Sequence, residues 1–335
     1  MIHKSISIVL ITALVLACGQ NTKNDRTFLP ESVGAINALQ VVAEDALWNG
    51  PVGDSIREWF AGATPGLPQS EPLFSISHLT PELFSDFARH SRLNLVIVLA
   101  DQDTSALRSN AYARPQLLAL VQGTSQASLL SQLNRKKTSL IAQMKAFELK
   151  ERQRRTRISP KTPEGLAEDF GVEIQMPSAY RTAAGTPKYH WFRKELADNG
   201  STNILVYEAP TEMLPRDTEY PGKYIRHIRD AVGSKLLPVE DDSRFITDTT
   251  YVPEVAVENI AGRQVVVTRG IWTLNDAYMA GPFLNMAIRD TVKNRVLILE
   301  GFSYAPAMAK RDLQFELESI LRTVKFIDHP TPKGE

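Results

Sequence analysis

The chain contains one cysteine, Cys18, among its 335 residues. A single thiol cannot form an internal disulfide, and if Cys18 is modified no cysteine is left for a nucleophile or a zinc–thiolate site. A chain of this length with 43% hydrophobic residues can still bury a sizeable core without disulfides. The single cysteine therefore excludes an internal disulfide, and its modification would also exclude the other two kinds of site. Neither excludes an oxidising compartment.

An excess of one charge and a long hydrophobic run are also missing. The 38 basic residues balance 38 acidic ones, so the net charge predicts no nucleic-acid partner. The most apolar stretch, residues 6–17, is shorter than the about 20 residues that a membrane-spanning helix needs. The composition is that of a globular protein with one large or two medium domains.

Histidines, glycines and acidic residues do not fall into catalytic or metal-binding spacings. No two of the six histidines lie four residues apart, as in a zinc peptidase, and no glycine-rich phosphate loop is present. The segment Gly123–Ala127 departs from the nucleophile elbow at its last residue, so Ser125 is predicted to cap a helix. The acidic residues 240–242 lack the glycine and glutamate of a calcium loop. The sequence predicts no catalytic residue, no metal and no cofactor.

A short hydrophobic segment led by Lys4 opens the chain and ends in Val15-Leu16-Ala17-Cys18. These four residues resemble a bacterial lipobox, in which small residues admit the peptidase and the thiol takes the diacylglycerol. We predict a lipoprotein signal peptide at residues 1–17 and a membrane anchor of acyl chains such as palmitate on Cys18. The alternatives are an ordinary secretory signal with a chance cysteine, or a buried strand.

Residues 18–36 are polar and small, which predicts a flexible tether after the lipidated cysteine, or alternatively a sorting signal. Residues 37–157 are predicted to form an α+β half. Strands are expected at 38–43, 73–76 and 93–100, with 115–122 as the antiparallel neighbour of 93–100, and helices at 52–61 and 80–89.

The strongest predicted helix runs from Ser125 to Arg155. Leucine, methionine and phenylalanine recur on one face at three- and four-residue steps, which predicts a core-facing side. The other face and the distal end are rich in lysine and arginine. This face is either solvated, with its cations near the helix C-terminus, or a contact for an anionic surface such as lipid headgroups.

Residues 158–327 are predicted to form a second α+β half, because residues 158–165 are rich in helix breakers. Its strands are expected at 171–177, 189–194, 203–207, 254–260, 264–274, 283–288 and 295–304. The last two should form a hairpin through residues 289–294. Helices are expected near 224–232 and at 309–324, and the tail 328–335 should be disordered.

The predicted fold class is α+β, with antiparallel sheets covered by helices. Residues 113–120 and 293–300 are similar strands that both lead into a helix. This similarity favours a duplication of one α+β unit, and the alternative is coincidence. The second half also has a pattern loosely similar to the antiparallel-sheet fold of the photosystem subunit PsbP and Mog-like proteins.

Several segments together resemble a lipoprotein family of Bacteroidota, domain of unknown function 4837. They are Trp48–Pro51, Pro68–Phe74, Arg269–Trp272, Gly281–Phe283, Glu300–Pro306 and Lys310–Arg311. The resemblance runs over nearly all of the chain after the signal peptide. It implies a cell-envelope lipoprotein and no reaction, because the family has none assigned.

The resemblance also bears on location. Surface-exported lipoproteins of that phylum often carry an acidic run after the lipidated cysteine, whereas residues 19–25 hold a single acid. We therefore expect an outer-membrane lipoprotein that faces the periplasm, with the cell surface as the alternative.

The segments that resemble the family predict one candidate ligand site. It is a shallow pocket that would hold a sugar or an anionic peptide. Its residues are Arg269, Trp272, Tyr304, Lys310 and Arg311. The alternative is that these aromatic residues pack in the core beside glycines. The leading hypothesis is a non-enzymatic module that binds an envelope protein or glycan; its rival is an envelope hydrolase that uses carboxylates and a histidine such as His190.

Overall fold

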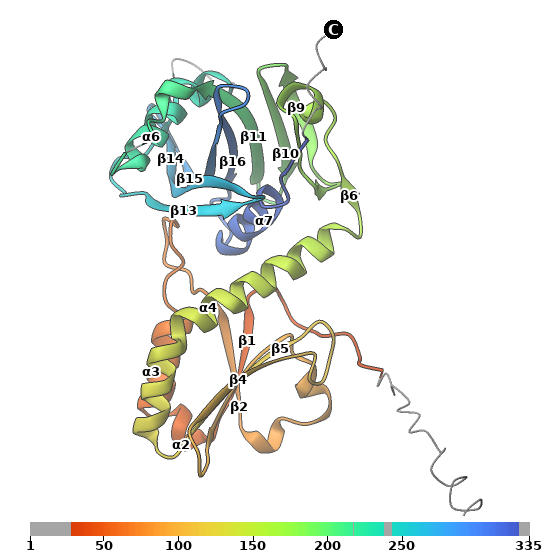
Figure 1. Ribbon diagram of the computed structural model, residues 1–335, viewed down its shortest axis with the longest axis vertical. Coiled ribbons are helices and arrows are strands. Elements are labelled where there is room, and N and C mark those ends of the chain that lie inside the picture. Colours follow the sequence, from red (N-terminus) through yellow and green to blue (C-terminus); the bar gives the residue numbers. More distant parts are fainter. Residues whose placement is uncertain (1–27, 217, 238–242, 328–335) are drawn as a thin grey trace, which may run out of the picture.

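The protein is described by a computed structural model covering residues 28–216, 218–237 and 243–327. The predicted signal peptide, Cys18, the first part of the tether, the acidic residues 240–242 and the tail 328–335 lie outside these residues. Two sheets, one from each half of the sequence, lie at opposite ends of the molecule, and helix α4 (Gln126–Thr156) runs between them (Figure 1).

The first sheet has five strands in the order β2-β1-β3-β5-β4. Helices α2 (Asp45–Trp48) and α3 (Pro51–Phe60) connect its first two strands along the chain. The strands are β1 (Ala38–Val42), β2 (Ser75–Leu79), β3 (Leu93–Leu99), β4 (Thr104–Ser109) and β5 (Leu117–Gly123).

The prediction that β3 and β5 pair antiparallel is wrong. They pair in parallel from Leu93 opposite Leu117 to Leu99 opposite Gly123, and β1 is parallel to both β2 and β3. The intervening β4 was not predicted; it lies at the sheet edge, antiparallel to β5. Near-continuous apolar runs such as Leu93–Leu99 are typical of central parallel strands, whereas antiparallel strands more often alternate.

The helix predicted at residues 80–89 is replaced by two 3₁₀ turns, η1 (Pro81–Leu83) and η2 (Asp86–His90). Asp86 interrupts the segment with a φ of 42°, in the left-handed region that a continuous right-handed helix cannot include. The segment therefore lies on the surface as a loop that leads into β3.

Helix α4 confirms the strongest helix prediction. The Ser125 side chain caps its N-terminus by accepting a hydrogen bond from the backbone N–H of Ser128. Leu129, Leu133 and Met144 from its first two thirds are buried in the core of the first sheet.

The second sheet is antiparallel throughout, with seven strands in the order β12-β14-β15-β16-β11-β10-β9 and β13 also paired to β14. The predicted hairpin is confirmed. Its strands are β9 (Arg181–Thr186), β10 (Tyr189–Glu195), β11 (Ser201–Pro210), β12 (Phe245–Thr247), β13 (Glu254–Ile260), β14 (Arg263–Leu274), β15 (Ala277–Asp290) and β16 (Arg295–Tyr304).

Helices cover both faces of the second sheet, as predicted for an α+β fold. Leu317, Ile320 and Leu321 of α7 (Arg311–Leu321) pack in the core on one face. Ile225 and Ile228 of α6 (Pro221–Ala231) pack in the core on the other face. The short elements are α5 (Leu166–Phe170), η3 (Thr211–Met213), η4 (Gly233–Lys235), β6 (Pro160–Lys161), β7 (Val172–Glu173), β8 (Met176–Pro177) and β17 (Lys325–Phe326).

The α+β class is confirmed, but the two sheets differ in topology. The first is mostly parallel and the second is antiparallel, so β5 and β16, which both lead into helices, occupy different positions in their sheets. These topologies do not support a duplication of one unit.

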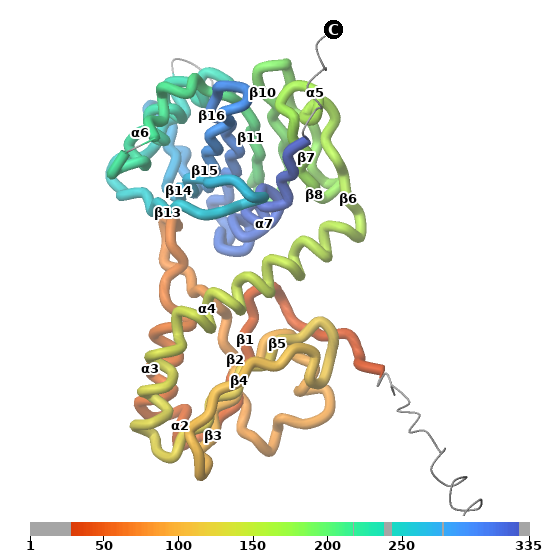
Figure 2. Tube along the Cα trace, viewed as in Figure 1, coloured from red at the N-terminus to blue at the C-terminus, as the bar shows by residue number. Residues whose placement is uncertain are grey.

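A buried ion pair fixes the N-terminal segment to α4. The Arg92 guanidinium donates to both carboxylate oxygens of Glu148, at 2.6 and 2.9 Å, and to the carbonyl oxygens of Gly34 and Ala35. The backbone N–H of Asn37 donates to Glu148 at 2.7 Å. Residues 30–37 therefore lie against the C-terminal half of α4 (Figure 2).

Asn37 continues this network into the second half of the chain. It is fully buried with a φ of 59°, and its side-chain amide donates to Asp312 of α7 at 3.0 Å. Its side-chain oxygen accepts a hydrogen bond from Lys145 at 2.9 Å. Asn37 thus joins α4 to α7 in a backbone conformation that asparagine tolerates better than most residues.

The distal basic face of α4 is engaged by acidic residues of the protein rather than solvated as a whole. Arg152 forms an ion pair with Glu316 of α7, which also binds Lys194 of β10. Arg154 and Arg155 both pair with Glu151. This half of the helix therefore joins the two sheets. Within the described residues, no helix has the length and apolar character needed to cross a membrane.

Replacing Asn37 with alanine should lower the free energy of unfolding by about 2–5 kcal/mol. Lost buried hydrogen bonds cost about 1–3 kcal/mol and a left-handed backbone about 1–2 kcal/mol more. Asn37→Gly loses the same bonds but tolerates the backbone, so it should be about 1 kcal/mol less destabilising. Denaturant unfolding of both variants measures this; equal losses, or a milder alanine variant, would contradict the role assigned to the backbone.

Candidate functional site

The five residues of the predicted pocket do not line one cavity. Arg269 and Arg311 line a pocket of about 50 Å³ between the two halves, together with Lys145 of α4, Phe315 and Glu318. Its volume has room for a few water molecules but not for a sugar or peptide. Arg269 is paired with Glu318 at 2.9 Å.

Trp272, Tyr304 and Lys310 lie outside that lining. The Trp272 ring is buried against Phe245 and Phe302, and its N–H donates to the Ser303 carbonyl oxygen at 3.1 Å. The Tyr304 ring packs against Trp272. Lys310 is buried, and its ammonium donates a hydrogen bond to the Met308 carbonyl oxygen. The aromatic residues therefore serve core packing, the alternative considered from the sequence.

Lys310 and Arg311 instead take part in the contact between the two halves. Their backbone N–H groups donate to the two carboxylate oxygens of Glu71, at 2.7 and 2.8 Å. Glu71 belongs to the loop before β2, so a carboxylate from the first half binds the N-terminus of α7. Unpaired N–H groups and the helix dipole favour an anion at that position.

Lys145 occupies the centre of this contact. Its ammonium donates to the side-chain oxygen of Asn37 and, at 2.6 Å, to the carbonyl oxygen of Leu73, and it lies 4.5 Å from the Phe74 ring centroid. Burial, reinforced by the positive charge of Arg311, lowers the pKa of Lys145 to about 8. These bonds join α4 to the first half, and the same ammonium lies 5.2 Å from the ring centroid of Phe315 in the second half.

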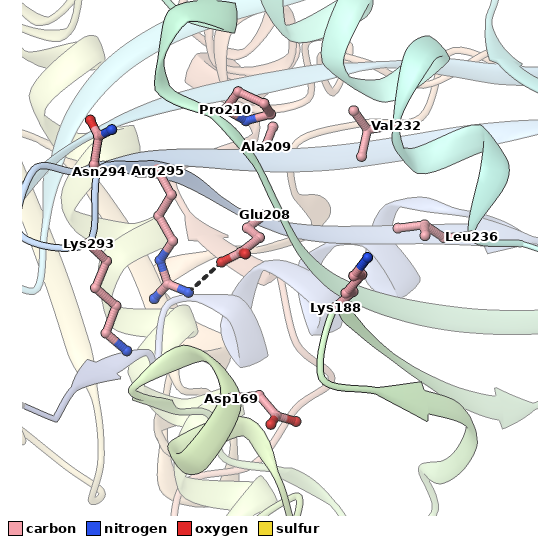
Figure 3. Close-up of a pocket in the computed structure, with 10 residues that line it drawn as sticks. All are labelled: Asp169, Lys188, Glu208, Ala209, Pro210, Val232, Leu236, Lys293, Asn294 and Arg295. Carbon is pink, nitrogen blue, oxygen red and sulfur yellow. Dashed lines mark hydrogen bonds and ion pairs between the residues drawn. The ribbon is translucent and has the colours of Figure 1, made fainter.

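The larger candidate site is a pocket of about 600 Å³ in the second half (Figure 3). It lies where the β15–β16 turn, the β9–β10 turn and the end of β11 meet α5 and the segment after α6. Its lining residues are Asp169, Lys188, Glu208, Ala209, Pro210, Val232, Leu236, Lys293, Asn294 and Arg295.

Arg295 forms the fixed centre of this pocket. Its guanidinium pairs with Glu208 at 2.8 Å and Asp290 at 3.2 Å and also donates to the Phe170 carbonyl oxygen. These bonds come from three separate segments. Because Arg295 is almost fully buried, they hold the guanidinium in one orientation and position the Glu208 carboxylate beside it.

Two exposed lysines flank the Arg295–Glu208 pair, as Figure 3 shows. Among the described residues, neither the Lys188 nor the Lys293 ammonium has an ion-pair or hydrogen-bond partner. Val232, Leu236 and Pro210 provide an apolar wall. This arrangement can bind a carboxylate or phosphate while an apolar part of the same ligand packs on the wall.

A buried ion pair positions the helix that contributes this wall. Arg229 of α6 binds both carboxylate oxygens of Glu300 on β16, at 2.8 and 2.9 Å, and Asn285 donates to Glu300 at 2.7 Å. The Arg229 guanidinium also lies 3.6 Å above the Phe283 ring centroid. These contacts fix α6 on the sheet and so place Val232, which directly follows it.

His190 forms an acid–histidine pair beside the pocket. Its Nε2 lies 2.7 Å from a carboxylate oxygen of Asp169, and its ring lies between Phe170 and Phe192. The other ring nitrogen faces Gly185, where even an added Cβ would lie 3.1 Å from it. Among the described residues, no hydroxyl group bonds to the ring. The pair joins α5 to β10 without the nucleophile that a hydrolytic triad requires.

The pH dependence of stability should reveal the buried Lys145. Its folded pKa of about 8 lies below the unfolded value of about 10.4, so between these values the unfolded chain retains a proton that the folded chain has released. The free energy of unfolding should therefore rise with pH through this window relative to Lys145→Met. Denaturant unfolding at pH 7.5 and pH 10 measures the difference.

The exposed Lys150 on the same helix provides a matched control. Lys150→Met should differ from the wild type by a similar amount at both pH values. A wild-type advantage over Lys145→Met that does not grow with pH would contradict the lowered pKa.

Comparisons with known proteins divide the chain between two families. Residues 159–323 match the model described as domain of unknown function DUF4837, and residues 32–157 match domain of unknown function DUF8532. The resemblance to the first family is confirmed over the second half, whereas Trp48–Pro51 and Pro68–Phe74 fall within the second model. No curated protein matches the chain.

The similar solved structures are remote. A Mog1 mutant and the Ran-binding protein Mog1p of Saccharomyces cerevisiae each match with 12% identity and a TM-score of 0.33, covering 51% of this chain and 97% and 96% of theirs. A Bacteroides thetaiotaomicron protein matches with 10% identity and a TM-score of 0.26, covering 50% of this chain and 47% of its own. These TM-scores are too low to assign a fold. The family models therefore divide the chain into a first half that matches DUF8532 and a second half that matches DUF4837, and both are domains of unknown function.

Proposed function

We propose that the protein is a non-enzymatic envelope lipoprotein that binds an acidic segment of a partner protein in the pocket of Figure 3. A lipid on Cys18 would anchor it to the outer membrane, facing the periplasm. The lipobox-like residues 15–18 support the anchor, and the low acid content of residues 19–25 supports the periplasmic orientation over the cell surface.

The observation that carries the binding proposal is a pair of lysines, Lys188 and Lys293, whose ammonium groups have no partner among the described residues and which flank a fixed Arg295–Glu208 pair. The two acids of the pocket are already paired, Asp169 with His190 and Glu208 with Arg295. An incoming carboxylate therefore meets cations whose charge no described acid neutralises. The adjacent apolar wall favours a ligand with aliphatic side chains.

An acidic peptide fits this pocket better than a glycan does. Sugars commonly stack on aromatic rings, and no aromatic side chain occurs among the described residues that line the pocket. The pocket also favours binding over hydrolysis, because the His190–Asp169 pair has its second ring nitrogen against Gly185 rather than facing a nucleophile.

Charge reversal at the two lysines should weaken binding of a fluorescent peptide of alternating glutamate and leucine. Each reversal replaces an exposed attraction worth about 1 kcal/mol or less, so the Lys188→Glu, Lys293→Glu variant should bind about tenfold more weakly. Fluorescence anisotropy at low salt measures the affinity, which should also fall as salt is added.

The control variant Lys136→Glu, Lys150→Glu makes the same change in net charge on exposed positions of α4. Equal weakening by both variants would show a general charge effect and would contradict a specific site. The lipid anchor is tested separately. The mass of the mature chain isolated from membranes should include a diacylglyceryl group. Replacing Cys18 with alanine should release the protein from the membrane fraction.

A further inference from the structure

The loop between β2 and β3 exposes apolar side chains on the surface of the first half. Leu83 is 61% exposed and Phe87 69% exposed. Phe84 packs edge-on against Tyr112, which is 37% exposed, and the Arg89 guanidinium lies 5.0 Å from the Tyr112 ring centroid. We call Leu83, Phe84, Phe87, Arg89 and Tyr112 the aromatic patch.

The N-terminal segment runs directly beside this patch. Residues Glu31 and Val33 form β-bridges with Arg114 and Ser91, and the Val33 N–H donates to the His90 carbonyl oxygen at 3.0 Å. Ser91 follows η2, which carries Phe87, and Arg114 lies two residues after Tyr112. Where the described chain begins, Phe28 is itself 92% exposed.

The short connection to Cys18 limits how far this surface can lie from an anchoring membrane. Nine residues lie between Cys18 and Phe28. The ten Cα–Cα steps from one to the other span at most about 35 Å when the chain is fully extended. The side of the protein where the chain begins is therefore held close to any bilayer that contains the lipid. Aromatic and arginine side chains are the types that favour the interface between headgroups and acyl chains.

We infer that the aromatic patch docks on the lipid surface to which Cys18 is anchored, so that the first half lies on the membrane. This inference rests on the lipid anchor of the proposed function but not on its ligand. The charges nearby are mixed, with Glu82 and Asp86 beside Arg89 and Arg114. Docking should therefore depend on the apolar side chains more than on anionic lipid.

The single cysteine permits a test that does not require natural lipidation. The mature chain is coupled through Cys18 either to vesicles of phosphatidylethanolamine and phosphatidylglycerol that carry a maleimide lipid, or to a soluble maleimide. Hydrogen exchange then compares the two forms. On vesicles, amides in residues 81–90 and 111–114 should exchange at least about threefold more slowly than in the soluble form. The tether raises the local lipid concentration and so favours docking of the patch.

Two variants, each losing one aromatic and one aliphatic side chain, separate the patch from exposed apolar residues elsewhere. Leu83→Ser, Phe87→Ser should abolish the vesicle-dependent protection, whereas Tyr251→Ser, Val257→Ser, on exposed positions of the second half, should retain it. Because all four side chains are exposed, both variants should fold, and their far-ultraviolet circular dichroism checks this.

Three outcomes would overturn the inference. The first is that the wild type coupled to vesicles shows no protection of the aromatic patch, and the second is that both variants retain the vesicle-dependent protection. The third is that the soluble form shows the same protection at high protein concentration, which would indicate that a second copy of the chain covers the patch. The lipid anchor itself is tested separately by mass spectrometry of the native mature chain. A mass without the diacylglyceryl group would contradict the anchor.

Discussion

The buried carboxylate of Glu148 is the constraint on which the arrangement of the chain depends. It has no contact with solvent, and its charge is balanced by Arg92 and by the backbone N–H of Asn37. Removing one partner of such a pair typically costs about 3–5 kcal/mol, because the other charge stays buried. Arg92, α4 and the segment before β1 must therefore fold together.

The same helix then determines where the second sheet lies. Three residues farther along α4 is Glu151, which organises Arg154 and Arg155, and the next residue, Arg152, reaches Glu316. From the other side, Glu71 binds the N-terminus of α7 and Asn37 binds Asp312. With polar contacts at several points along α4 and α7, the two halves have a defined relative orientation.

This orientation separates the two surfaces to which we assign binding. The pocket with Lys188 and Lys293 lies at the hairpin end of β16, whereas the other end of that strand leads to α7 and the contact with α4 (Figure 1). The aromatic patch lies on the first half, beside the point where the described chain begins. A membrane bound at the patch would leave the pocket directed away from the lipid, where a partner protein could reach it.

Local signals predicted the elements, but the pockets depend on contacts distant in sequence. The serine cap and the leucine spacing of α4, and the short polar turn before Arg295, are features within a few residues, and the structure confirms them. The parallel pairing of β3 with β5 requires β4, which lies between them in the sequence, to occupy the sheet edge beyond β5, and apolar runs alone do not specify this order. Lys188 and Lys293 come from two turns and Glu208 from the end of β11, and only the folded sheet brings these segments together. The cations at the hairpin turn were the one signal of this site in the sequence. The sequence left Trp272 between a ligand pocket and the core, because aromatic residues suit both cores and sugar sites.

Photo-crosslinking in intact cells tests this two-ended arrangement most directly. A photoreactive amino acid is placed at Phe87 in the patch or at Leu236 in the wall of the pocket, and the crosslinked products are identified by mass spectrometry. We predict lipid adducts at position 87 and protein adducts at position 236. Lipid adducts at position 236, or no lipid adduct at position 87 in a chain that carries its lipid anchor, would contradict the arrangement.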